Sequence, residues 1–240
     1  MLYQADFQYS YTNFQKLGSD PAVKLHGILM KNIPSELAES LHQPQCQPLA
    51  IYCRPTEPNC FLARVSVLND KTAPLLDTLK QLKKLNFRGA DDTVTLCGYE
   101  EKKPIDICRL PNPLNKNVLT LNFLTPAAIL KNGKPTTPLS IEAYFMSVLR
   151  KLQEFEQITI HQDTFQEAFL ACSDLEYQLQ TVTHEISGYT GHGIVGRVTL
   201  RLPQMQMQAE ILKTVFSYAG YCGVGAKTTQ GMGGFLVTSF

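Results

Sequence analysis

Strand-like and helix-like segments follow one another in the same order in both halves of the chain, and this order restricts the fold more than any other feature. An early helix is predicted to begin at Asp20-Pro21, to break near Pro34 and to resume over 35–42. Leucines at helical spacing predict a second helix over 73–85. Segments in which apolar and polar residues roughly alternate predict strands at 2–11, 49–56, 61–68 and 93–97.

The second half repeats this order without any repeat of individual residues. Helices are predicted at 139–155 and 208–219, and strands at 118–124, 169–183, 194–202 and 235–240. The order β-α-β-β-α-β, read twice, predicts an α+β protein made of two tandem ferredoxin-like, RRM-like domains. We place the domains at 1–117 and 118–240, since about 120 residues is a common domain size.

Composition excludes several classes of function. The 22 basic and 21 acidic residues give a net charge of +1, too little for a general nucleic-acid coat, so any nucleic acid must be bound by a local patch. No segment resembles a membrane span or a signal peptide, and we expect a cytoplasmic protein that binds no membrane. The seven cysteines form no C-x-x-C pair, so we expect reduced thiols and no metal site.

A glycine-rich segment at 220–235 stands between the last predicted helix and the last predicted strand. It holds six of the 15 glycines of the chain, together with Lys227 and two threonines. Glycine at this density indicates a tight backbone or a close approach by a ligand. The lone lysine among them is typical of a place where the protein contacts a phosphate.

Two nucleotide-binding patterns in the sequence are excluded by their context. Residues 191–196 match G-x-G-x-x-G, but a predicted strand follows them where a dinucleotide site needs a helix. Residues 220–228 miss the P-loop pattern by one inserted residue and follow a helix where a strand is required. Neither segment therefore predicts a nucleotide cofactor.

The spacing that remains is a Gly-Val-Gly triplet at 223–225, five residues, and a Gly-Met-Gly triplet at 231–233. This loop resembles that of the CRISPR-associated repeat-processing endoribonucleases of the RAMP (repeat-associated mysterious protein) superfamily. Segments 188–200 and 123–126, the latter reading Phe-Leu-Thr-Pro, are similar to stretches of the same family. Segment 35–42 is similar to the end of the first helix, which in that family carries a histidine.

The resemblance implies an enzyme that binds CRISPR repeat RNA and cleaves precursor transcripts to release guide RNAs. The resemblance also implies that no metal or cofactor takes part, and that the ribose 2′-hydroxyl attacks the phosphate and leaves a 2′,3′-cyclic phosphate. Such a reaction needs a base, an acid and donors for the phosphorane charge. Association with a CRISPR effector complex and a homodimer are further partners that this interpretation allows.

His42 matches the catalytic position of the family. From its place alone, a histidine at a helix end is also explained by stabilisation of its cation by the helix dipole. The tyrosine and lysine that accompany this histidine in some relatives have no counterpart here, and His26 and Lys31 are the substitutes on offer. In one straight helix, His26 and His42 would lie roughly 24 Å apart, so they converge only if Pro34 breaks the helix.

The predicted RNA-binding residues lie in the second half. They are the glycines and the lysine of the loop and two arginines that alternate on one face of a predicted strand: Gly223, Gly225, Lys227, Gly231, Gly233, Arg197 and Arg201. No aromatic RRM signature is present, so we expect recognition of shape and phosphates. The alternative is a non-catalytic RAMP protein that binds guide RNA inside an effector complex.

Overall fold

A computed structural model describes residues 1–11, 21–42, 46–87, 93–110, 116–138, 140–186 and 189–239. The first half contains, in chain order, β1 (Tyr3–Ser10), α1 (Pro21–Lys31), α2 (Ser35–His42), β2 (Leu49–Pro55), β3 (Cys60–Val67), α3 (Pro74–Gln81), β4 (Lys84–Asn86), β5 (Thr93–Glu101) and η2 (Ile107–Arg109). The second half contains β6 (Val118–Ala127), β7 (Ile129–Lys131), β8 (Lys134–Thr136), η3 (Ile141–Phe145), α4 (Met146–Glu156), α5 (Gln162–Leu170), β9 (Ser173–Ile186), β10 (Tyr189–Arg201), α6 (Gln206–Cys222), η4 (Thr228–Gln230) and β11 (Phe235–Ser239).

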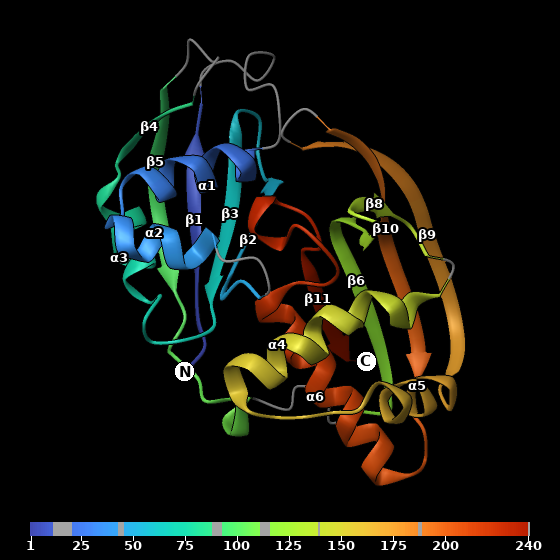
Figure 1. The fold of residues 1–240 in the computed structure, drawn as a ribbon. Helices are drawn as coiled ribbons and strands as arrows, with labels where there is room; N and C mark the ends of the chain where they lie inside the picture. Colours follow the sequence, from blue (N-terminus) through green and yellow to red (C-terminus); the bar gives the residue numbers. More distant parts are fainter. Residues whose placement is uncertain are drawn as a thin grey trace.

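Each half forms its own antiparallel sheet (Figure 1). The first has the order β2-β3-β1-β5-β4, and the second has the order β11-β6-β10-β9. Without the short edge strand β4, both sheets have the 4-1-3-2 order of a βαββαβ unit. The prediction of two tandem ferredoxin-like domains is therefore confirmed.

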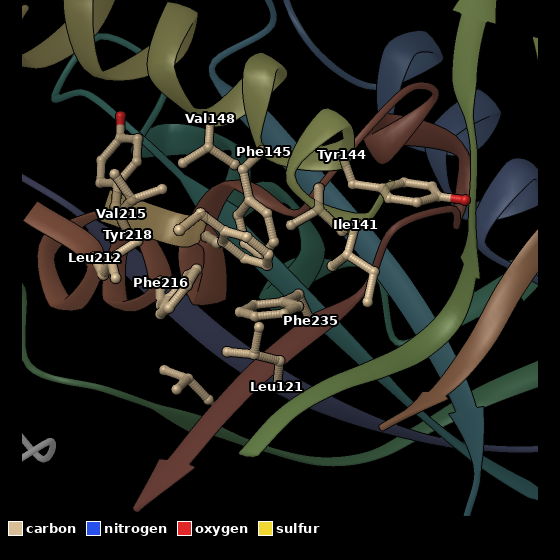
Figure 2. Packing of buried hydrophobic residues seen from close by; sticks show 14 of the residues in the cluster. Leu121, Ile141, Tyr144, Phe145, Val148, Leu212, Val215, Phe216, Tyr218 and Phe235 are labelled. Atoms are coloured by element: carbon tan, nitrogen blue, oxygen red, sulfur yellow. The ribbon is translucent and has the colours of Figure 1, made fainter. Parts of the chain in front are cut away.

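The core of the second half shows why one face of its sheet is covered by helices (Figure 2). Phe145 of η3 packs against Phe216 of α6 and Phe235 of β11, with ring centroids 5.0 and 5.4 Å apart. All three side chains are buried. Burial of large aromatic rings contributes most of the energy of such a core, so α6 and β11, which flank the glycine-rich segment, are firmly fixed.

The two halves pack against each other through the first sheet. Gln4 of β1 donates hydrogen bonds to Ser66 Oγ at 2.8 Å and to the Gly220 carbonyl of α6 at 3.2 Å. Leu2 and Leu68 belong to the buried core of the second half. The boundary between 117 and 118 stays a prediction, because the core of one half includes residues of the other.

Several predicted elements are confirmed and others are corrected. Pro34 does separate two helices, α1 and α2. The helix predicted over 73–85 ends at Gln81, because 84–86 instead pairs with β5 as an edge strand. The strand predicted from 169 begins at Ser173, since Phe169 packs into the core as part of α5. Asp20, proposed as a helix start, lies outside the described residues.

The described helices include none that is both long and apolar enough to cross a membrane. The segment 191–196, which matches the dinucleotide pattern, lies within β10. The residues that follow this segment form a strand, as predicted, where a dinucleotide site needs a helix. The dinucleotide-binding interpretation is therefore excluded.

Candidate functional site

The glycine-rich loop between α6 and β11 is shaped by close contacts with backbone atoms, some in the loop itself and some in the segment that follows β6. Gly225 and Gly233 have positive φ angles of 75° and 65°. A Cβ atom on Gly225 would lie 2.2 Å from the carbonyl oxygen of Ala128, and one on Gly233 would lie 1.9 Å from that of Val224. Only glycine fits at these two positions, so the spacing of the motif is required by the fold of the loop itself.

The amides of this loop are largely used inside the protein. Gly225 donates to the carbonyl of Tyr144 at 2.9 Å and to Ser147 Oγ at 2.8 Å. Gly233 donates to the carbonyl of Pro126 at 2.9 Å. A ligand would therefore meet the side chains of the loop more than its amides, and the positively charged side chain of the loop, Lys227, is exposed. Lys227, the residue just before η4, has a positive φ of 58°.

The loop forms one wall of a pocket of about 660 Å³ that contains residues of both halves. In Figure 1 the loop is the red segment beside β2 and α1. The first half contributes His26 of α1 and Leu41 of α2, while α4 contributes Arg150 and Lys151. The remaining lining residues are Cys46, Gln47, Ile129, Leu130, Ala143, Met146, Ser147 and the loop residues Gly225, Ala226, Lys227, Thr228, Thr229 and Gln230.

The charge of this pocket differs from that of the whole chain. The lining residues include three cations, Arg150, Lys151 and Lys227, and no Asp or Glu is found among them in the described part of the structure. A hollow with one sign of charge concentrates ions of the opposite sign, here phosphates. The local basic patch expected from the near-neutral composition is thus present between the two halves.

Both helices that Pro34 separates contribute a residue to this pocket. His26 is partly buried and lines it, and so does Leu41, the residue before His42. His42 is the last residue of α2, and its side chain lies outside the described part of the structure. Lys31 is exposed at the end of α1 and is not among the residues that line the pocket.

A small apolar cluster holds α1 against the loop. Met232 and Ala128 are buried together, and Val23 of α1 packs on them. The adjoining η4 also packs against α1 and β2. The helix that carries His26 and the loop that carries Lys227 are therefore parts of one packed surface.

The two predicted arginines of β10 lie elsewhere. Arg197 and Arg201 flank Val198 and Leu200, which point into the core, so both arginines lie on the opposite face of the sheet. Both are exposed, and Nη2 of Arg197 lies 4.0 Å from Oε1 of Glu176 in β9. Neither lines the pocket, and the structure does not bring them together with Lys227.

Sequence reasoning missed Arg150 and Lys151. They lie in a helix with several charged residues, and such residues are usually expected on the solvent-exposed face of a helix. The sequence does show that Ser147 and Lys151 are four residues apart and therefore share one helix face. Two polar side chains on one face of the helix could have indicated a polar contact at that face.

The fold and the loop have known counterparts. Residues 121–235 match the family described as CRISPR-associated endoribonuclease Cas6. A curated protein of that description from Streptococcus thermophilus is 22% identical over 243 residues, covering 94% of this chain and 95% of the relative. A Thermus thermophilus Cas6 in a product complex superposes with a TM-score of 0.81 at 22% identity, covering 99% of this chain and 100% of that one.

A more distant structure, described as a RAMP protein binding different RNA substrates, superposes with a TM-score of 0.64 at 10% identity. It covers 99% of this chain and 100% of its own. The resemblance predicted from the glycine-rich loop is confirmed by the family match, which spans that loop as far as the start of β11.

Proposed function

We propose that this chain, a relative of the CRISPR-associated repeat-processing endoribonucleases, binds CRISPR repeat RNA and cleaves precursor transcripts to release guide RNAs. The observation that carries the proposal is the pocket between the halves. It joins the histidine-bearing helices of the first half to the glycine-rich loop of the second and contains only basic charges among its described lining residues.

The reaction proposed is a transesterification in which the ribose 2′-hydroxyl attacks the neighbouring phosphate. The 2′-oxygen forms a bond to phosphorus while the bond to the 5′-oxygen breaks, leaving a 2′,3′-cyclic phosphate and a 5′-hydroxyl. We assign a proton transfer to His42, the last residue of α2, because its neighbour Leu41 lines the pocket and imidazole titrates near neutral pH. This chemistry requires no metal.

His26 is the second proton-transfer group that we propose. It lines the same pocket as Leu41, the neighbour of His42. The arrangement of α1 and α2 therefore supports a joint role for His26 and His42, although the two residues are 16 positions apart in the sequence. Lys31 remains a weaker alternative because of its exposed place at the helix end. The cations Lys227 and Arg150 are placed to attract the phosphate and to stabilise the charge of the phosphorane.

The glycines Gly223, Gly225, Gly231 and Gly233 support RNA binding through the shape of the loop. We propose that Arg197 and Arg201 make separate phosphate contacts on the outer face of β10. The two sets of contacts are compatible with an RNA that passes over both halves and is recognised by its backbone.

The test uses the intact protein with its own repeat RNA. His42→Ala should abolish cleavage while RNA binding persists, and His26→Ala should slow the single-turnover rate. His192→Ala is the matched control, because this exposed histidine of β10 does not line the pocket. Product ends should carry a cyclic phosphate and cleavage should continue in EDTA; unchanged cleavage by His42→Ala would remove His42 from the mechanism.

The same assay tests the alternative of a non-catalytic RNA-binding subunit, which the similarity to a RAMP protein described as binding RNA supports. A protein that shifts repeat RNA in a gel but leaves it uncut would favour that role. Light scattering with and without RNA would test the homodimer, and co-purification would test association with an effector complex.

A further inference from the structure

Lys151 has a buried ammonium group, and no ion pair between it and a carboxylate is found among the described residues. It lies on α4, and only 6% of the residue is exposed. Among the residues that the structure describes, no Asp or Glu forms an ion pair with it. Burial lowers the pKa of its ammonium group because the charged form loses its hydration. A buried lysine is costly, so its contacts should be of use to the protein.

The ammonium group of Lys151 links two separate points of the glycine-rich loop. Nζ donates a hydrogen bond to the carbonyl of Cys222 at 2.7 Å and another to Thr228 Oγ1 at 3.0 Å. Cys222 is the last residue of α6, where a carbonyl has no partner within the helix. Thr228 is the first residue of η4. One side chain therefore closes the segment 223–227 from both of its ends.

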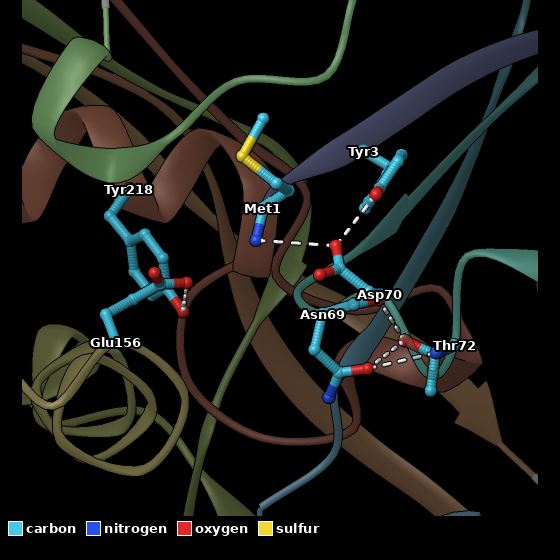
Figure 3. A network of polar contacts seen from close by, with 7 residues as sticks. All are labelled: Met1, Tyr3, Asn69, Asp70, Thr72, Glu156 and Tyr218. Carbon is cyan, nitrogen blue, oxygen red and sulfur yellow. Dashed lines mark hydrogen bonds and ion pairs between the residues drawn. The ribbon is translucent and has the colours of Figure 1, made fainter.

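The helix that carries Lys151 is itself firmly placed. One turn before it, Ser147 accepts the amide hydrogen of Gly225 on the same helix face. At the far end of α4, the hydroxyl of Tyr218 from α6 lies 3.4 Å from Glu156 Oε1, as Figure 3 shows. Lys151 thus holds the loop from a scaffold that is fixed to α6.

We infer that Lys151 is a positioning residue that holds the segment 223–227, and with it Lys227, in the shape that binds an RNA phosphate. The role in RNA binding rests on the proposed function, whereas the ordering of the loop does not. Lys227 is the exposed residue of this segment, and its backbone has the left-handed conformation, which is uncommon for a residue other than glycine. Loss of the contacts from Lys151 should release this conformation.

Hydrogen exchange in the free protein tests the ordering of the loop without RNA. Lys151→Met removes both hydrogen bonds and keeps the length of the side chain, and Thr228→Val removes one of them with little change of shape. Both should speed exchange of amides in 223–233, by roughly tenfold for Lys151→Met. Arg150→Met is the matched control for this exchange measurement, since it removes a charge from the same helix and the Nε of Arg150 donates to the carbonyl of Met146 within that helix. Unchanged exchange in the loop, or an equal increase in β1 and β3, would overturn the inference.

Affinity for repeat RNA tests the consequence of that ordering. Lys151→Met should weaken the binding of repeat RNA by about tenfold, because the variant loses the two hydrogen bonds that the charged Nζ donates to the loop. The double variant with Thr228→Val should bind no more weakly than Lys151→Met alone, because both changes break the same link. Fully additive effects would contradict the link. If the unaltered protein binds no repeat RNA, the proposed function fails, and hydrogen exchange still decides the ordering of the loop.

Discussion

The hydroxyl of Thr125 accepts a hydrogen bond of 2.8 Å from the amide of Gly234. Two segments that resemble the same family, Phe-Leu-Thr-Pro at 123–126 and the glycine-rich loop, are thus one structural unit. The carbonyl of Pro126 accepts the amide hydrogen of Gly233 at 2.9 Å and completes the junction. The start of the second half and its last strand are joined at the base of the loop.

Thr125→Val should lower the free energy of unfolding by about 1–2 kcal/mol, because the buried amide of Gly234 would lose its acceptor. Denaturation by urea would measure the change. Thr238→Val is the control, since Thr238 of β11 is partly exposed and should change stability by less than about 0.5 kcal/mol. Equal losses in the two variants would contradict the role of Thr125.

Two glycines of the same segment should respond in opposite ways to alanine. Gly233→Ala places a Cβ atom 1.9 Å from the carbonyl oxygen of Val224 at a positive φ, so the loop must deform. We expect a loss of several kcal/mol and of RNA binding. Gly220→Ala lies in α6 with open space around the new atom, and helix propensity should make it neutral or stabilising by up to about 1 kcal/mol. Thermal melts of both variants would compare them.

The thiol of Cys222 should resist alkylation in the folded protein. Burial raises its pKa to about 11, so the reactive thiolate is scarce at pH 8, and the side chain is inaccessible as well. Cys97 and Cys108 are exposed and should react with iodoacetamide under the same conditions. Mass spectrometry of peptides would measure labelling at each site. Rapid native labelling of Cys222 would mean that the end of α6 opens readily.

RNA affinity should fall as salt rises, and Lys227 should contribute to that dependence. Lys227→Gln should reduce the slope of log K against log salt by about 0.7 if it neutralises one phosphate of a single strand. Lys71→Gln is the control, because this exposed lysine lies outside the pocket. A slope that changes equally in both variants would exclude a specific contact by Lys227.

The order of elements could be predicted from the sequence because each main strand and helix carries its own periodicity. The hairpin of β7 and β8 was missed, although Asn132 and Gly133 at its tip have positive φ angles and form a recognisable turn signal. The α5 helix also carried a signal in the buried residues Phe165, Ala168 and Phe169, at helical spacing. Both elements are short, and the longer strand patterns beside them were easier to recognise.

The pocket could be predicted only in part. The glycine spacing and His42 were recognised by resemblance, but no local pattern shows that His26 and Arg150 line one cavity. That arrangement follows from the packing of α1 against the loop and of α4 beneath it. It depends on contacts between residues distant in sequence, which periodicity does not report.

The burial of Leu2 and Leu68 in the core of the second half bears on how the chain matures during synthesis. Ribosomes add about 5–20 residues per second, so these two leucines emerge many seconds before the helices and strands that cover them. Until then the first half has an incomplete surface and exposed apolar side chains. The chain would therefore reach its final form only after β11 is made, with the glycine-rich loop among the last parts to close.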